Sequence, residues 1–220
     1  EEPVKGAETV KVVSYNVGRF RSSRDKLKMN ACRDSVFNFI RRSDADIICL
    51  QEFYLLNGSA SLKTLIQARL KVYTPTYYLY SGRYGRFGNV ILSRYPVRNK
   101  GHVEFDSSVN LAVWADYSIG GRTLRVYNCH LESYNISPAK LLRSLKNRDD
   151  AEIEAAGRKA KRSIRQRSEQ VDRIFREMEN SPVESIICGD FNDSPLSYTY
   201  CNTRRGHRDA FMDAGKGFGG

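Results

Sequence analysis

Polar residues that could manage a water molecule follow an apolar run near the end of the chain. The run Ile186-Ile187-Cys188 breaks at Gly189 and continues as Asp190-Phe191-Asn192-Asp193-Ser194-Pro195. This pattern indicates a buried strand that ends in a polar loop, with Gly for the bend and Ser-Pro to stop the strand. If the backbone stays extended through Phe191, Asp190 and Asn192 point to the same side. Such a carboxylate and amide could deprotonate water and stabilise an oxyanion.

Four further polar residues adjoin apolar runs. Asn16 and His130 close predicted strands, Glu52 follows one, and Asn89 opens one. Taken singly, the ordinary explanations are turn formation for Asn16 and Asn89, a solvated charge for Glu52 and a structural histidine for His130. Asp190-Phe191-Asn192 alone would likewise be a loop with Asx turns. Five such positions together favour a site, because strand ends on one rim hold side chains rigidly.

The elements that must position these residues are strands interleaved with helices. Predicted strands run over 10–16, 46–51, 72–80, 89–93, 111–117, 122–130 and 185–189, with a glycine hairpin turn at 118–121. Predicted helices run over 27–42, with Val36, Phe39 and Ile40 on one side, over 62–70, and through 171–178 as the continuation of a basic segment. Residues 134–157 lack clean periodicity and are interpreted as a long, mobile surface excursion. This alternation predicts mixed sheets covered by helices.

Length and composition limit the number of domains and the class of protein. The 220 residues, without repeats or composition shifts, predict a single domain over 1–220. No apolar run reaches membrane-spanning length, so we expect a soluble domain. Because the sequence starts Glu1-Glu2-Pro3 without Met, a signal peptide or membrane anchor could precede it. The sequence does not indicate a cellular location.

The net charge indicates the class of partner, and the cysteine pattern indicates the state of the thiols. The net charge is +11, which favours anionic partners such as nucleic acid, phosphorylated metabolites or an anionic membrane. Two basic clusters stand out, and each is most simply a solvated face: they comprise Arg19, Arg21, Arg24, Lys26 and Lys28, and Arg158, Lys159, Lys161, Arg162, Arg165 and Arg167. The five cysteines are odd in number and form no C-x-x-C pair, so we expect free, buried thiols.

Five ordered segments resemble the endonuclease/exonuclease/phosphatase superfamily, which includes deoxyribonucleases, abasic-site endonucleases, sphingomyelinases and inositol 5-phosphatases. The matching segments are Ser14-Tyr15-Asn16-Val17, Leu50-Gln51-Glu52, Gly88-Asn89-Val90-Ile91-Leu92-Ser93-Arg94, Asn128-Cys129-His130-Leu131 and Gly189-Asp190-Phe191-Asn192-Asp193. More narrowly, the basic helix followed by Cys188-Gly189-Asp190-Phe191-Asn192-Asp193 resembles uncharacterised members from Bacteroidetes-type bacteria, many of which carry membrane helices ahead of this domain.

The resemblance implies a four-layer α/β sandwich, with two mixed, mostly antiparallel sheets face to face and helices outside. It implies that Glu52 is the principal ligand of a Mg²⁺ or Mn²⁺ ion, with Asn16 beside it. It further implies that Asp190 orients or deprotonates the attacking water and that Asn192 stabilises charge. His130 would contact phosphate, and Asn89 is a candidate substrate contact. Hard oxygen ligands suit these ions, which neutralise charge during in-line attack on phosphorus.

One departure concerns the carboxyl terminus. The family continues with an Asp-bearing strand and a Ser-Asp-His segment, whereas this sequence stops at Gly217-Phe218-Gly219-Gly220. We therefore expect the domain to be incomplete here, with its C-terminal strands missing. If the natural chain ended at Gly220, we would expect negligible hydrolysis, because losing a transition-state contact costs about 10²–10³ in rate.

Two functions follow as hypotheses. The first is a divalent-metal-dependent phosphoric ester hydrolase, a phosphodiesterase or nuclease, acting as a monomer on nucleic acid or a phospholipid headgroup. The second is a non-catalytic module that binds the same anionic ligands. The aromatic residues Tyr77, Tyr78 and Tyr80 do not by themselves single out nucleic-acid bases.

Overall fold

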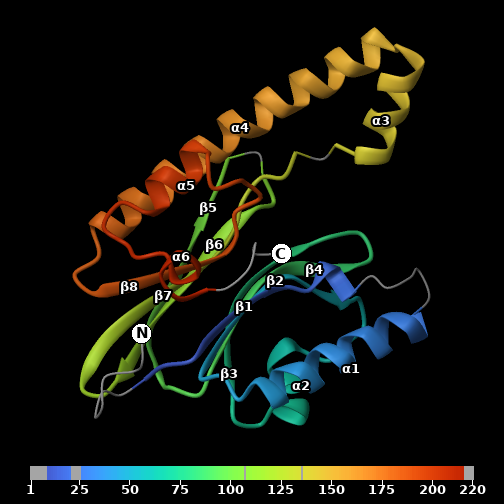
Figure 1. Ribbon diagram of the computed structural model, residues 1–220. Coiled ribbons are helices and arrows are strands. Elements are labelled where there is room, and N and C mark those ends of the chain that lie inside the picture. The colour runs from blue at the N-terminus through green and yellow to red at the C-terminus, as the bar shows by residue number, and fades with distance from the viewer. Residues whose placement is uncertain (1–8, 21–25, 107, 135, 216–220) are drawn as a thin grey trace. The chain divides into compact units, whose positions relative to one another are not determined.

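The computed structural model describes residues 9–20, 26–106, 108–134 and 136–215 (Figure 1). Its contacts divide the chain into two compact units. The sandwich unit comprises residues 2–130 and 177–190, and the helical unit comprises residue 1, residues 131–176 and residues 191–220. The sequence interpretations that involve Glu1-Glu2-Pro3, Arg21, Arg24 and 217–220 lie outside the described residues.

The sandwich unit contains two four-stranded mixed sheets, as predicted. The first has the order β1-β2-β4-β3, formed by β1 (Val12–Asn16), β2 (Ile47–Leu56), β4 (Gly85–Ser93) and β3 (Thr74–Ser81). The second has the order β5-β6-β7-β8, formed by β5 (Val97–Glu104), β6 (Leu111–Ile119), β7 (Arg122–His130) and β8 (Glu184–Asp190). Among the described strands, β1–β2 and β7–β8 pair in parallel and the other neighbours are antiparallel.

Strand β2 shows why the sandwich forms. Its first residues are apolar without interruption because both faces of the strand are covered. Ile47 and Cys49 face the core between the sheets, together with residues of β4, β6 and β7. Ile48 and Leu50 face the opposite core, which is closed by helices α1 (Lys26–Ser43) and α2 (Leu62–Arg69) (Figure 1).

Most predicted elements are confirmed, with differences that have physical causes. Strand β5 was not predicted, because its first five residues, Val97–Gly101, are mostly polar and exposed or half-buried at a sheet edge. In α1 the buried residues are Val36, Phe37 and Ile40, whereas Phe39 is exposed and packs edge-to-face on Tyr15. The predicted hairpin turn is confirmed: Gly120 and Gly121 both have positive φ between β6 and β7.

The helical unit corrects the prediction of a mobile excursion over 134–157. This stretch forms α3 (Pro138–Asn147) and the first turns of α4 (Asp150–Glu179). Helix α3 is capped by the Ser137 hydroxyl, which accepts the Lys140 N–H, and it ends at Arg148 in the left-handed conformation. Two short helices follow, α5 (Tyr198–Thr203) and α6 (Ala210–Ala214). No helix in the described part of the chain is long and apolar enough to cross a membrane.

Candidate active site at the strand ends

The two parallel strand pairs bring the predicted polar residues of the sandwich unit together. Strand β1 lies against β8, and β2 lies against β7. Asn16, His130 and Asp190 are the last residues of β1, β7 and β8. The register pairs His130 with Asp190 and Asn16 with Gln51. Four side chains predicted for the site, those of Asn16, Glu52, His130 and Asp190, therefore meet at one edge.

The amide of Asn16 joins the two carboxylates. Its Nδ2 donates to Glu52 Oε1 at 3.2 Å and to Asp190 Oδ2 at 2.7 Å. Its Oδ1 accepts the backbone N–H of Gly18 at 2.9 Å. Because the oxygen is held by a backbone donor, the amide nitrogen must face the carboxylates. Residues separated by 36 and 174 positions in the chain are thus held within hydrogen-bonding reach of one nitrogen.

Glu52 occupies a bulge rather than the end of its strand, which corrects the prediction that the strand closes there. The pairing of β2 with β4 shifts between Leu50 and Phe53, and Glu52 has φ of 52°. A bulge re-aims one side chain without ending the strand. The carboxylate has Arg19 Nε 3.5 Å from Oε2 and His130 Nε2 3.9 Å from Oε1.

Arg19 is a site residue that the sequence interpretation missed. It was counted in a basic cluster, yet it contacts Glu52 and its guanidinium lies 4.5 Å from the centre of the Phe87 ring. It sits in the short 3₁₀ turn η1 (Gly18–Phe20) that follows β1, with φ of 54°. The sequence feature that could have indicated this role is the position of Arg19, three residues after Asn16.

A buried amide network lies beneath this edge. Gln51 Nε2 donates to Asn128 Oδ1 at 2.6 Å, and Asn128 Nδ2 donates to the carbonyls of Leu50 and Val90. Asn89 is fully buried, and its Nδ2 donates to the carbonyls of Leu111 and Asn128. These bonds join the two sheets and fix their register. The substrate contact expected of Asn89 stays a prediction.

Asn192, the remaining predicted residue, belongs to the helical unit. The extended backbone stops at Asp190, and Asn192 has φ of 50°, so the strand alternation does not continue through Phe191. Asn192 Nδ2 donates to the carbonyl of Leu131 at 2.9 Å. This bond fixes the amide against the segment that follows β7.

Arg167 corrects the interpretation of the second basic cluster as a solvated face. Its side chain has no exposed surface. Its Nε donates to Asp193 Oδ2 at 3.1 Å, its Nη1 donates to the Glu132 carbonyl at 2.9 Å, and it lies over the Tyr134 ring. Arg167 therefore ties the loop containing Asn192 to the segment after β7.

The pKa of Asp193 reflects this setting. Burial alone would raise it, but the Thr199 hydroxyl, the Ser194 N–H and the positive charge of Arg167 together hold the pKa below its usual range. Asp193 is therefore ionised at neutral pH and is the counterion of the buried guanidinium.

Comparison with known proteins identifies the family. The model of the "Endonuclease/Exonuclease/phosphatase family" matches residues 13–219, almost the whole chain. This chain belongs to the endonuclease/exonuclease/phosphatase family. Members of the family are metal-dependent phosphoesterases and nucleases. No curated protein matches the sequence significantly.

Solved structures share the family fold at low identity. Human nocturnin with bound sulfate is 18% identical, with a TM-score of 0.60 over 87% of this chain and 67% of its own. Sphingomyelinase C from Streptomyces griseocarneus is 20% identical, with a TM-score of 0.60 over 89% and 68%. A humanized D. rerio TDP2 is 15% identical, with a TM-score of 0.59 over 89% and 70%.

The ligand types at this edge fit the divalent ion that endonuclease/exonuclease/phosphatase members use. The described residues contain no group of three or more His, Cys, Asp or Glu side chains arranged to hold a metal. Mg²⁺, however, is commonly held by one or two carboxylates plus waters and substrate phosphates. Glu52 and Asp190 supply two carboxylates, held together by the Asn16 amide. Their oxygen atoms are the kind of ligand that Mg²⁺ binds.

Proposed function

We propose that this chain is a divalent-metal-dependent phosphoric ester hydrolase that attacks phosphodiesters with water. The observation that carries the proposal is the Asn16 amide, which donates to both Glu52 and Asp190. A surface cluster formed by chance would not be expected to align two carboxylates from opposite sheets on one donor. We further propose that residues 1–220 act as one catalytic domain, because the family match spans both units.

We propose for each residue the role that the family resemblance implies. Glu52 and Asn16 would hold a Mg²⁺ or Mn²⁺ ion, which when bound supplies positive charge to neutralise the phosphoryl oxygens. Asp190 orients the attacking water and takes its proton, and the hydrogen bond from Asn16 fixes the direction of that carboxylate. His130, at the end of the neighbouring strand, donates to a phosphoryl oxygen. Asn192 stabilises charge on the phosphoryl group.

The net charge and the structural neighbours support two candidate classes of substrate. The net charge of +11 favours polyanions or anionic surfaces. D. rerio TDP2 has been seen with a single-strand DNA product, and another neighbour is a sphingomyelinase. Nucleic acid and phospholipid headgroups are therefore the two substrates to test. A monomer is expected.

The test is hydrolysis by the full-length protein with Mg²⁺ or Mn²⁺. A generic phosphodiester, plasmid DNA and a phospholipid panel are offered to wild type, Glu52→Ala, Asp190→Ala and Glu184→Ala. Glu184 is an exposed carboxylate on the same strand as Asp190 and pairs with Arg122 at the surface. We expect rate losses of about 10²–10³ for the first two variants and none for Glu184→Ala.

Two results would decide against the proposal. Equal activity of wild type and both site variants would remove these residues from the site. Binding of the anionic substrates without any hydrolysis in either metal would instead support the non-catalytic module. Cleavage of lipid alone would exclude the nuclease and leave the phosphodiesterase.

A further inference from the structure

Helix α3 exposes leucines among basic residues. Leu142 and Leu145 are 56% and 53% exposed. Spaced by three, they share one side of the helix with Ala139, and Arg143 and Lys146 flank them. We define the outer face of α3 as the exposed residues Ala139, Leu142, Arg143, Leu145 and Lys146.

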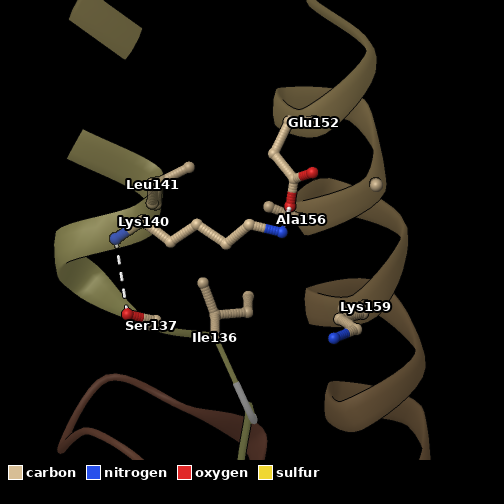
Figure 2. Close-up of a pocket in the computed structure, with 8 residues that line it drawn as sticks. Ile136, Ser137, Lys140, Leu141, Glu152, Ala156 and Lys159 are labelled. Atoms are coloured by element: carbon tan, nitrogen blue, oxygen red, sulfur yellow. Dashed lines mark hydrogen bonds and ion pairs between the residues drawn. The ribbon is translucent and has the colours of Figure 1, made fainter. Parts of the chain in front are cut away.

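A different set of residues packs α3 against α4. Leu141 and Ile136 line a hollow of about 150 Å³ between α3 and α4, whose opposite wall includes Ala155 and Ala156. Figure 2 shows Leu141 on the side of α3 that faces α4 and Lys140 reaching toward Glu152. Lys140 Nζ lies 2.6 Å from Glu152 Oε1. The outer leucines are therefore not needed for this packing.

The exposure of the leucines is a property of a well-formed helix. The Ser137 cap begins α3, and Pro138 takes its first position, where a missing N–H costs nothing. At the other end the Arg148 N–H bonds to the carbonyls of Leu145 and Ser144, and the Ser144 side chain is buried. These caps define where α3 begins and ends, so the two leucines lie within a regular helix.

The surroundings of the outer face are basic. Residues 138–165 contain nine basic and four acidic side chains. On α4, Lys161 and Arg162 are exposed, whereas Lys159 lines the hollow that faces α3. An excess of positive charge around exposed leucines is complementary to a surface that is both apolar and anionic.

We propose that the outer face of α3, with the exposed basic residues of α4, docks on an anionic lipid bilayer. The leucines enter the boundary between headgroups and acyl chains, while the basic residues contact the lipid phosphates. A nucleic acid would use the charges but gain nothing from Leu142 and Leu145. This inference does not rest on the proposed hydrolysis, because it concerns a surface of the helical unit alone.

The experiment is co-sedimentation of the protein with vesicles of phosphatidylcholine alone or mixed with phosphatidylglycerol. The variants are Leu142→Ser/Leu145→Ser and Arg143→Gln/Lys146→Gln. Matched controls are Leu196→Ser/Met212→Ser, which are more exposed apolar residues of the same unit, and Lys71→Gln/Arg83→Gln, which are exposed bases elsewhere. Urea unfolding confirms that each variant folds as wild type does.

We expect wild type to prefer the anionic vesicles. The leucine variant should bind them about tenfold more weakly, since burying even one leucine is worth that factor. The basic variant should lose about fivefold for each charge removed. Both controls should bind as wild type does.

Unchanged vesicle binding by the leucine variant overturns the proposal, as does an equal loss in its control. A third outcome also overturns it: the leucine variant keeps vesicle binding while the basic variant loses binding to a short DNA duplex. That result would assign the surface to nucleic acid.

Discussion

At the scale of single residues, Arg167 and Asp193 form a buried ion pair within the helical unit. Arg167→Met keeps the length of the side chain but leaves Asp193 buried without its counterion. We expect the free energy of unfolding in urea to fall by about 3 kcal/mol. Arg165→Met is the control: this arginine is 83% exposed and pairs with Glu169 one turn away, so its loss should cost less than about 0.5 kcal/mol. Equal effects would mean that burial of Arg167 contributes nothing.

The same pair predicts the acid sensitivity of the fold. The pKa of Asp193 is lower in the folded protein than in the unfolded chain, so the unfolded chain binds the proton more readily. The stabilisation is present above about pH 4 and is lost as the pH falls through the folded pKa. In Asp193→Asn this part of the decrease in stability at low pH should be absent. Urea unfolding midpoints measured across a pH series test this. An unchanged acid profile in this variant would contradict the assignment.

Site residues could be predicted where the sequence marks the end of a strand. Asn16, His130 and Asp190 each stand at a change from apolar to polar residues, and such boundaries report where a sheet ends. Arg19 and Arg167 were not predictable in this way. An arginine in a basic run gives the same pattern whether its guanidinium is solvated or buried against a carboxylate.

At the scale of elements, Gly189 controls the approach of β8 to β7. A Cβ at this position would lie 1.9 Å from the carbonyl oxygen of Cys129, and φ is 140°. The glycine thus permits close pairing within the strand, rather than the bend after it that the sequence suggested. Because β8 ends with Asp190, this pairing also positions the proposed water-activating carboxylate.

Gly189→Ala should therefore destabilise the protein by about 3 kcal/mol or more and reduce hydrolysis. Gly157→Ala is the matched control, since the added methyl in α4 meets nothing within 4 Å. That change should stabilise by up to about 1 kcal/mol, because alanine favours a helix. Thermal unfolding measures both variants, and similar melting temperatures would refute the steric argument.

Helices and strands were not fully predicted where the pattern of apolar residues did not match the usual period of the element. Helix α3 places leucines on its outer face as well as toward α4, so no single apolar stripe marks it. Strand β8 was expected to be buried, yet Ile186, Ile187 and Cys188 are only half-buried. Among the described strands, β8 pairs only with β7, so it is an edge of its sheet. The apolar sequence indicated a strand but not which position it takes.

At the scale of the whole molecule, the basic excess should make activity depend on salt. We expect kcat/KM for plasmid DNA to fall about tenfold or more from low to moderate salt, because phosphate contacts release counterions. A small phosphodiester with a single charge should change by less than about twofold. Comparing the two substrates across one salt series separates the electrostatic attraction of the polyanion from any effect of salt on metal binding. A parallel decline of both rates would exclude it.

The Asn16 amide also sets when the proposed site can exist during synthesis. Its two carboxylate partners lie 36 and 174 residues along the chain. A ribosome-bound chain that has not yet released Asp190 can form β1 and β2 but has no second carboxylate to align. Contacts of such sequence separation carry a large loop-closure cost, and they form only once both partners have been synthesised. Nascent chains that end before Asp190 should therefore show no hydrolysis, because the proposed site lacks its second carboxylate.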